Sequence, residues 1–172
     1  MKTLVAQPLT AQAFKPFGDV IETQGRDWFS INNGSTERYH HLSEVDLAEP
    51  GDRAIINIFR ASALEMPLRI EMMERHPRGS QAFIPLRGQP FVVVVAEAGA
   101  PPRADQLRAF TVRADQGVNY RQGVWHHPII CLAAQDDFLV IDRLGEGNNC
   151  DEHFFAVDEQ LQLHIPETGV ER

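Results

Sequence analysis

Short apolar runs separated by turn residues recur along almost the whole chain. Of all the sequence features, this alternation of runs and turns limits the possible folds most. Clear cases are residues 54–60, 81–85 and 91–96, each bounded nearby by proline or glycine. Turn signals of this kind at intervals of roughly 8–12 residues are typical of all-β sandwiches and barrels. Helix-period patterning is almost absent. A chain of 172 residues with this pattern is therefore expected to be all-β and to form one domain over residues 1–172.

The elements can be placed approximately from the same pattern. A strand that enters a turn is expected within residues 28–34, because Asn-Gly supplies the positive φ of tight turns. Thr10 is a plausible N-cap for one helical turn over residues 10–14, and a second turn is expected over residues 104–107. Strands are further predicted at residues 19–22, 54–60, 68–76, 81–85, 91–96, 108–112, 117–120, 129–133, 138–143, 152–157 and 161–165.

Residues 68–76 combine strand patterning with functional side chains. Their alternation with period 2 predicts that Leu68, Ile70, Met72, Glu74 and His76 share one face of a strand. That face begins with apolar residues and ends with a carboxylate and an imidazole. We interpret it as one wall of a ligand cavity.

Composition narrows the classes of partner. The formal net charge of −8 argues against nucleic acid or an anionic membrane surface, although one arginine can still hold a small carboxylate. The first eight residues do not resemble a signal peptide, and no apolar run is long enough to span a bilayer. The two cysteines, Cys131 and Cys150, lack CxxC spacing, which fits a reducing compartment. These features together predict a cytoplasmic protein.

Two short motifs resemble those of the cupin superfamily. The first cupin motif reads H-x-H, then Glu, then Gly; here Glu74 and His76 hold the two histidine positions, Gln81 the glutamate position and Gly88 the glycine position. The second motif, G-x-x-H, is matched by the tetrapeptide that ends at His126. Two of the four metal-ligand positions are therefore altered.

A longer resemblance is to the bacterial ureidoglycolate lyase family, and it runs in order from about residue 14 to residue 152. The segments that carry it are residues 17–22, 31–34, 37–40, 74–77, 80–85, 91–96, 116–120, 124–128, 137–139, 141–143 and 149–151. The resemblance implies a cupin-like double-stranded β-helix, that is a jelly-roll barrel, with minor short helices. It also implies a homodimer that splits (S)-ureidoglycolate into glyoxylate and urea during allantoin degradation. Nickel is a possible cofactor by this resemblance, and no organic cofactor is implied.

The chemistry expected from the resemblance centres on Glu74, His76, Gln81 and His126. In one version a divalent metal is held by His76 and His126, with Glu74 and Gln81 as weaker ligands. In the other version no metal is needed, and His126 or Glu74 removes the substrate's hydroxyl proton. Gln81 and Asn32 then donate hydrogen bonds to substrate oxygens. The sequence leaves both versions open.

Each of these residues also has a simpler interpretation. Glu74 can pair with a nearby arginine at a strand end, and Gln81 can stabilise a turn. A single histidine at a strand end is more often a surface or hydrogen-bonded residue than a ligand. His127 faces away from His126 if both lie on one strand, so we expect a structural or interface role for it.

Four residues are candidates for substrate binding outside this set. Arg38 and Arg143 can form bidentate pairs with a carboxylate, with surface solvation as the alternative. Asn32 can face the cavity or belong to the turn, and Tyr39 can cap the cavity mouth or pack at an edge. Whether Asp142 or Arg143 points inward is not decided by pattern alone.

Two other functions compete with the lyase hypothesis. One is a hydrolase that acts on ureidoglycolate and releases ammonia and carbon dioxide. The other is a cupin that binds a small carboxylate without turning it over. The sequence offers no basic helix-turn-helix segment through which such a binding protein could act on DNA directly.

Overall fold

Strands make up almost all of the regular structure in the computed structural model, which describes residues 2–167. Met1 and residues 168–172, the two ends of the expected domain, lie outside the described residues. In chain order the elements are β1 (Lys2–Pro8), α1 (Ala11–Phe14), β2 (Gly18–Ile21), β3 (Phe29–Ile31), the 3₁₀ turn η1 (Asn32–Gly34), β4 (Thr36–Arg38), β5 (Arg53–Ser62), β6 (Arg69–Ile70), β7 (Met72–Arg75), β8 (Gln81–Pro85), β9 (Phe91–Ala96), the 3₁₀ turn η2 (Ala104–Gln106), β10 (Arg108–Val112), β11 (Gly117–Tyr120), β12 (Trp125–His126), β13 (Ile130–Cys131), β14 (Gln135–Leu144), β15 (Asp151–Phe154) and β16 (Leu161–His164).

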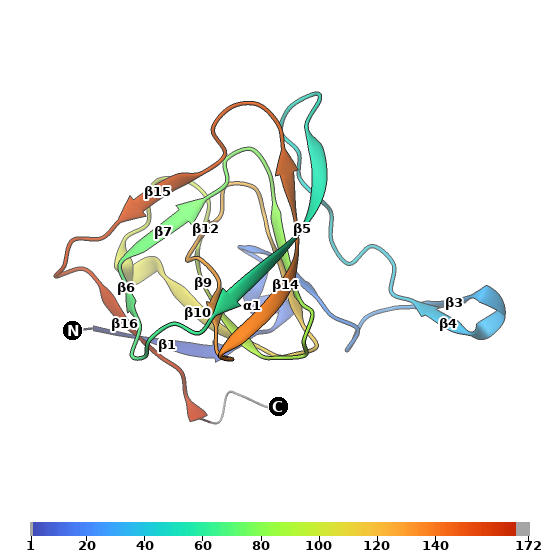
Figure 1. The fold of residues 1–172 in the computed structure, drawn as a ribbon, viewed down its shortest axis with the longest axis horizontal. Coiled ribbons are helices and arrows are strands. Elements are labelled where there is room, and N and C mark those ends of the chain that lie inside the picture. The colour runs from blue at the N-terminus through green and yellow to red at the C-terminus, as the bar shows by residue number, and fades with distance from the viewer. Residues whose placement is uncertain (1, 168–172) are drawn as a thin grey trace.

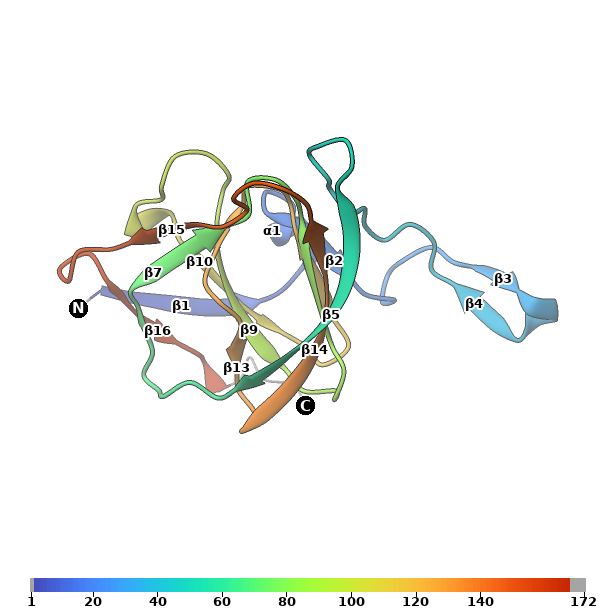
Figure 2. The same cartoon turned by 45° about the horizontal axis from the view of Figure 1, so that its top comes forward.

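Two curled sheets face each other and form a cupin-like jelly-roll barrel (Figure 1). The first has the strand order β15-β7-β12-β9-β10-β1-β16-β6, with β13 also paired to β9. The second has the order β2-β11-β8-β14-β5. The strands β3 and β4 pair only with each other among the described residues, and this hairpin projects from the barrel (Figure 2). The predicted all-β fold class is confirmed.

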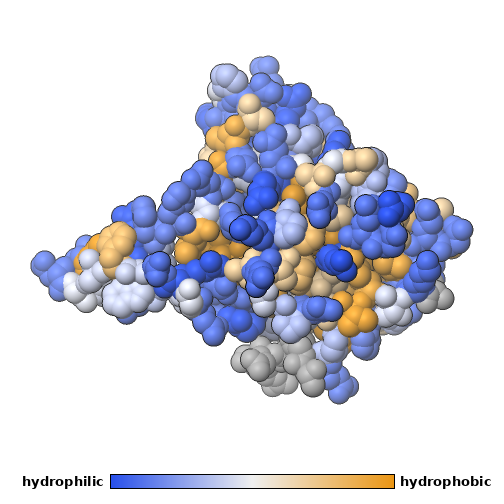
Figure 3. Space-filling model, turned by 180° about the vertical axis from the view of Figure 1, so that it is seen from behind, coloured by the Kyte–Doolittle hydropathy of each residue, from blue (hydrophilic) through white to orange (hydrophobic). Residues whose placement is uncertain are grey.

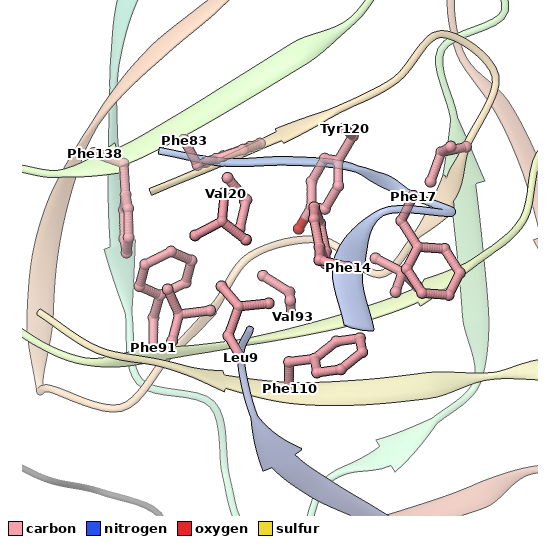
Figure 4. Close-up of a cluster of buried hydrophobic side chains, with 14 of the residues drawn as sticks. Leu9, Phe14, Phe17, Val20, Phe83, Phe91, Val93, Phe110, Tyr120 and Phe138 are labelled. Carbon is pink, nitrogen blue, oxygen red and sulfur yellow. The ribbon is translucent and has the colours of Figure 1, made fainter. Parts of the chain in front are cut away.

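The position of β9 between two apolar clusters explains why this strand is apolar at every residue. Phe91, Val93 and Val95 pack in the cluster between the two sheets (Figure 4), whereas Val92 and Val94 pack in a second cluster on the other face. Both faces of the strand are therefore buried, and neither has a place for a polar side chain.

The short helix α1 begins where the sequence predicted. The Thr10 side chain accepts a hydrogen bond from the backbone N–H of Ala13 at 3.2 Å, which is N-cap geometry. The helix places Phe14 in the barrel core, with ring centroids 5.8 Å from Phe17 and 5.9 Å from Phe110. No helix within residues 2–167 is long and apolar enough to cross a membrane.

The prediction of one alternating strand over residues 68–76 is wrong. Strand β6 pairs with β16, whereas β7 pairs with β12 and β15, and Glu71 lies between them outside either strand. The interruption shifts the alternation by one residue, so Ile70 and Met73, rather than Ile70 and Met72, are fully buried in one cluster. Glu74 follows Met73 on the strand and therefore points to the opposite face, into the barrel. Strands β1, β4 and β12 had not been predicted.

Gly18 gives the first testable prediction. Its φ is +151°, and a Cβ built there would lie 1.9 Å from the backbone oxygen of Asn119 on the paired strand β11. Gly18→Ala is expected to lower the free energy of unfolding by at least about 2 kcal/mol, measured by urea denaturation. Gly25 is the control, because it has φ +70° but open space around it, and Gly25→Ala should cost about 1 kcal/mol. Equal losses would contradict the steric explanation.

Candidate functional site

The barrel interior becomes polar where β7 and β12 pair. Glu74 and His126 are directly opposite each other in this antiparallel ladder, and His126 is also opposite Val95 of β9. His126 Nε2 lies 3.4 Å from Glu74 Oε1. The His126 ring is buried and stacks on Tyr120, with centroids 4.4 Å apart and planes 13° apart. The register and the stacked ring hold a carboxylate and an imidazole side by side.

His76, just after β7, and Gln81, at the start of β8, complete a group of four. His76 Nε2 lies 3.0 Å from Gln81 Oε1, and its ring centroid lies 5.0 Å from that of His126. The other ring nitrogen, Nδ1, lies 2.7 Å from the backbone oxygen of Asn149. The structure thus brings together the four side chains that the sequence singled out. We call Glu74, His76, Gln81 and His126 the Glu74 centre.

Gln81 is itself oriented by a residue that the sequence left undecided. Its amide nitrogen donates to Asp142 Oδ2 at 3.2 Å, so its amide oxygen faces His76. Asp142 Oδ1 accepts from the Asn57 side chain at 2.9 Å. A hydrogen-bonded row therefore runs from Asn57 through Asp142 and Gln81 to His76. In this orientation Gln81 presents its amide oxygen, an acceptor, to His76, whereas the metal-free hypothesis assumed that Gln81 donates.

The electrostatics of the centre favour an ionised carboxylate beside a neutral imidazole. Burial acts to raise the pKa of Glu74, but the histidines around it, chiefly His126, outweigh burial and lower it. Burial lowers the pKa of His126 despite the nearby carboxylate. Burial, reinforced by Glu74, raises the pKa of Tyr120, which therefore stays a neutral phenol.

The tautomer of His126 follows from its backbone contact. Its Nδ1 lies 3.2 Å from the carbonyl oxygen of Val124, which can only accept, so Nδ1 carries the proton. In the neutral ring, Nε2 then presents a lone pair toward Glu74. This buried atom has no hydrogen-bond partner within residues 2–167. The lone pair of His126 Nε2 and the carboxylate of Glu74 repel each other. A proton or a cation bound between these two atoms would stabilise them.

The same atoms fit a metal ion. Ligand atoms of Glu74, His76 and His126 all lie within 4.8 Å of one another. Bonds of about 2.1 Å place neighbouring ligands about 3–4 Å apart, so only small side-chain movements are required. Both imidazoles can donate Nδ1–H to a backbone carbonyl, the outer contact that metal-bound histidines usually make. Two imidazoles with a carboxylate suit several first-row divalent ions and select none of them.

Arg143 lies on the opposite face of β14 from Asp142, so the alternative that the sequence left open is resolved with Asp142 inward. Its buried guanidinium donates to Asp52 Oδ2 at 2.5 Å and to the Glu146 carbonyl at 2.7 Å. The hydrogen bond from Arg143 lowers the pKa of Asp52. Arg143 lines a surface cleft of about 920 Å³ with residues 49–53, 78 and 144–147. Its charge is already paired there, away from the Glu74 centre.

The other three substrate-binding candidates lie on the projecting β3–β4 hairpin. Asn32 is exposed at its turn and donates to Thr36 Oγ1 at 3.3 Å. Arg38 lies over the Phe29 ring, 5.9 Å from its centroid, and Tyr39 donates to Glu37 at 2.8 Å. Within one copy of the chain, the structure does not bring Asn32, Arg38 and Tyr39 to the Glu74 centre.

Sequence reasoning left Asp142 undecided and missed Asn57 and Tyr120. Asp142 shares the inward face of β14 with the buried residues Phe138 and Val140, but Leu139 and Ile141 make the other face equally apolar in the sequence. Asn57 likewise alternates with Phe59, which packs on Phe83 inside the barrel. Tyr120 looked like an ordinary core residue. Only the packing of the two sheets, which brings β11 close to β12, reveals that its ring stacks on His126.

Comparison with known proteins gives a consistent result. A family model described as ureidoglycolate lyase matches residues 1–163. A protein of Pseudomonas paraeruginosa described as ureidoglycolate lyase is 64% identical over 163 residues, which are 95% of this chain and 96% of that protein. One of Azotobacter vinelandii with the same description is 61% identical over 166 residues, covering 96% of this chain and all of that protein.

Solved structures show weaker similarity. RmlC from Streptococcus suis, in complex with dTDP-D-xylose, aligns with a TM-score of 0.43 and 10% identity over 91% of this chain and 73% of that one. RmlC from Legionella pneumophila, a dTDP-6-deoxy-D-glucose-3,5-epimerase, aligns with a TM-score of 0.38 and 13% identity over 85% of this chain and 77% of that one. At these TM-scores the likenesses indicate nothing about the reaction.

Proposed function

This chain belongs to the ureidoglycolate lyase family, and we propose that the Glu74 centre is where it cleaves (S)-ureidoglycolate into glyoxylate and urea. The family membership predicted from the motifs is confirmed, and it favours the lyase over the hydrolase and the non-catalytic binding protein. One observation carries the assignment to these residues. An ionised Glu74 and the unpartnered Nε2 of His126 lie beside His76 where the barrel interior becomes polar.

The reaction first requires removal of a proton from the substrate's hydroxyl group. Ureidoglycolate carries a hydroxyl, a carboxylate and a ureido nitrogen on one carbon. Glu74, ionised because the neighbouring histidines lower its pKa, accepts the hydroxyl proton. His126 Nε2 lies 3.4 Å away with its lone pair toward Glu74 and can share that proton.

Collapse of the alkoxide forms the aldehyde of glyoxylate and breaks the carbon–nitrogen bond. The bonding electrons pass to the ureido nitrogen, which must gain a proton to leave as urea. Both ring nitrogens of His76 face oxygen atoms, at 2.7 and 3.0 Å, and a ring with two N–H groups satisfies both contacts. His76 is therefore the donor to the departing nitrogen. Its orientation depends on Gln81, and that of Gln81 depends on Asp142.

A metal fits the same residues, and we propose nickel as its identity from the family resemblance. Glu74, His76 and His126 would hold it, with the Gln81 oxygen as a further ligand. When bound, it would act as a Lewis acid that lowers the pKa of the substrate's hydroxyl group. The donor set carries only one negative charge, so we expect weak binding.

Metal binding gives the second prediction. Nickel titrated into the chelator-treated wild type should give a calorimetric signal with an affinity reduced about 10-fold or more in His76→Ala. His153→Ala, on a neighbouring strand outside the centre, should bind as the wild type does. An unchanged affinity in His76→Ala would contradict the proposed ligands. Turnover that survives chelation would favour the acid–base mechanism without metal.

Asp142 gives the third prediction, because it positions Gln81 and does not touch the reacting atoms. Asp142→Asn replaces one of the two carboxylate oxygens that accept from Gln81 and Asn57 with an amide nitrogen. Gln81 is then no longer held in one orientation, and His76 loses the fixed oxygen that it faces. We expect kcat to fall about 10-fold with little change in KM, and Asp142→Glu to recover part of the loss. A change confined to the melting temperature would indicate that Asp142 has only a structural role.

The products distinguish the competing functions. Purified protein and (S)-ureidoglycolate should release urea and glyoxylate in equal amounts, without ammonia. Ammonia and carbon dioxide in place of urea would show the hydrolase. Binding without either product would show the non-catalytic cupin.

The wider setting is also part of this proposal. We place the reaction in allantoin degradation, in the cytoplasm, and treat residues 1–172 as one domain. We also propose that the protein is a homodimer, as the family resemblance implies. The projecting β3–β4 hairpin is the structural feature that a second copy would explain.

A further inference from the structure

The β3–β4 hairpin has no partner in the described residues. Residues 28–39, which we call the arm, leave the barrel and extend past it (Figures 1 and 2). Its strands pair only with each other within residues 2–167. A lone two-stranded hairpin is only marginally stable in water, so further contacts are needed to hold the arm in place.

The arm exposes aromatic surface. Trp28 is 51% exposed and Phe29 is 48% exposed, and apolar side chains are visible along the arm in Figure 3. A projecting element with two exposed aromatic rings is typical of a segment that packs on a protein surface.

A matching apolar surface lies on the outer side of the sheet next to the arm. Strand β5 is the edge of its sheet, and its outward residues Ile56 and Ile58 are 74% and 64% exposed. Ile58 is directly opposite Leu139 of β14, which is in turn opposite Ile84 of β8, so the apolar surface continues across three strands. The arm leaves the body on this side in both views (Figures 1 and 2). One molecule therefore presents both an apolar arm and an apolar sheet face, which makes it complementary to a second copy.

The Glu74 centre lacks an arginine for the substrate's carboxylate. The arginines nearest to it along the chain are already bound elsewhere: Arg75 to Asp151 at 2.9 Å and Arg78 to Glu49 at 3.4 Å. Arg143, next to Asp142, is paired with Asp52 on the opposite face of β14. Within residues 2–167, no guanidinium forms a hydrogen bond or an ion pair with the four side chains of the centre.

The arm carries the missing groups. Among the described residues, Arg38 makes no ion pair, and its guanidinium lies 5.9 Å from the centroid of the Phe29 ring. Asn32 and Asn33 both adopt left-handed backbone conformations, with φ of 53° and 55°, a conformation uncommon outside glycine and found often at ligand sites. The hydrogen bond from Ser35 Oγ to the Asn32 carbonyl at 2.9 Å fixes this turn.

We propose that two copies exchange arms, so that Arg38 and Asn32 of one copy complete the Glu74 centre of the other. The arm packs on the outer face of β5 in the second copy. The guanidinium of Arg38 binds the carboxylate of ureidoglycolate as a bidentate pair, and Asn32 donates to a second substrate oxygen. This inference rests on the proposed function. It explains why three predicted substrate residues lie far from the centre in one chain.

Hybrid dimers test the exchange directly. Arg38→Ala and Glu74→Gln each remove one half of the site, and each parent dimer should lose about 30-fold or more in kcat/KM. With different affinity tags, the dimer that contains one copy of each variant can be purified. If the arms are exchanged, one of its two centres has an intact Glu74 and receives an intact arm. The hybrid should therefore show half of the wild-type turnover per dimer.

The outcomes separate the two proposals. A hybrid that is no more active than its parents overturns the exchange. If each arm completed the centre of its own copy, both centres of the hybrid would be defective.

Sedimentation velocity gives an independent readout. The wild type should be a dimer and Ile58→Asp largely a monomer, whereas a monomeric wild type overturns the proposal. Wild-type turnover by the Glu74→Gln parent overturns the proposed centre, and the arm's role there with it. Arg108→Ala, which removes an exposed guanidinium from β10, is the control and should leave turnover and assembly unchanged.

Discussion

Glu74→Gln is expected to reduce kcat for urea release from (S)-ureidoglycolate at least about 100-fold. The change keeps the shape of the side chain but replaces an ionised proton acceptor with a neutral amide that cannot take the hydroxyl proton. Losses of about 10²–10⁴-fold are usual when a positioned general base is removed. The measurement is the initial rate of urea and glyoxylate release at saturating substrate, corrected for spontaneous decomposition of the substrate.

The matched control for this change is Glu71→Gln. Glu71 lies three residues earlier, is exposed and belongs to neither adjoining strand. Its substitution should leave kcat within about twofold, since isolated surface charges contribute little. If Glu74→Gln kept most of its activity with an unchanged melting temperature, Glu74 would not be the base.

His126→Gln should give the second large loss, again about 100-fold in kcat. The imidazole places a lone pair 3.4 Å from Glu74, and its stack on Tyr120 fixes the plane of the ring. Glutamine loses the ring, the stack and the titratable nitrogen at once. We also expect reduced metal affinity in this variant, because one of three ligands is removed.

His127 supplies the comparison for that substitution. It follows His126 in the chain, and its Nδ1 binds the Pro128 carbonyl at 2.8 Å, outside the centre. His127→Gln should keep turnover within a few-fold. Similar losses in both variants would indicate that the β12 backbone has been disturbed, and that His126 has no special role.

The sequence predicts the fold class because the evidence for it is local. Turn residues and short apolar runs define most strands, and the uninterrupted residues Phe91–Ala96 indicate a strand buried on both faces. The break between β6 and β7 at Glu71 has no such local signal in the sequence. It arises because β6 and β7 pair with different strands, and pairing partners are distant in the sequence.

The candidate site is predictable in part for the same reason. Glu74, His76, Gln81 and His126 match the short motifs of the cupin superfamily, and this resemblance implies that they converge. Asp142 depends on which parity of β14 faces inward, which only the packed barrel decides. Asn149 contributes a backbone oxygen, and the identity of its side chain gives no signal for that contact. The arm residues have the expected chemistry, but no local pattern in the sequence encodes the second copy that we propose as their partner.

The position of glyoxylate in a crystal of the chain tests the central claim most directly. We predict density for the product within hydrogen-bonding distance of Glu74 or His126, with its carboxylate toward Arg38 from the arm of a second copy. The main competing location is the cleft of about 920 Å³ beside Arg143. Glyoxylate bound in that cleft, with the Glu74 centre empty, would contradict the account.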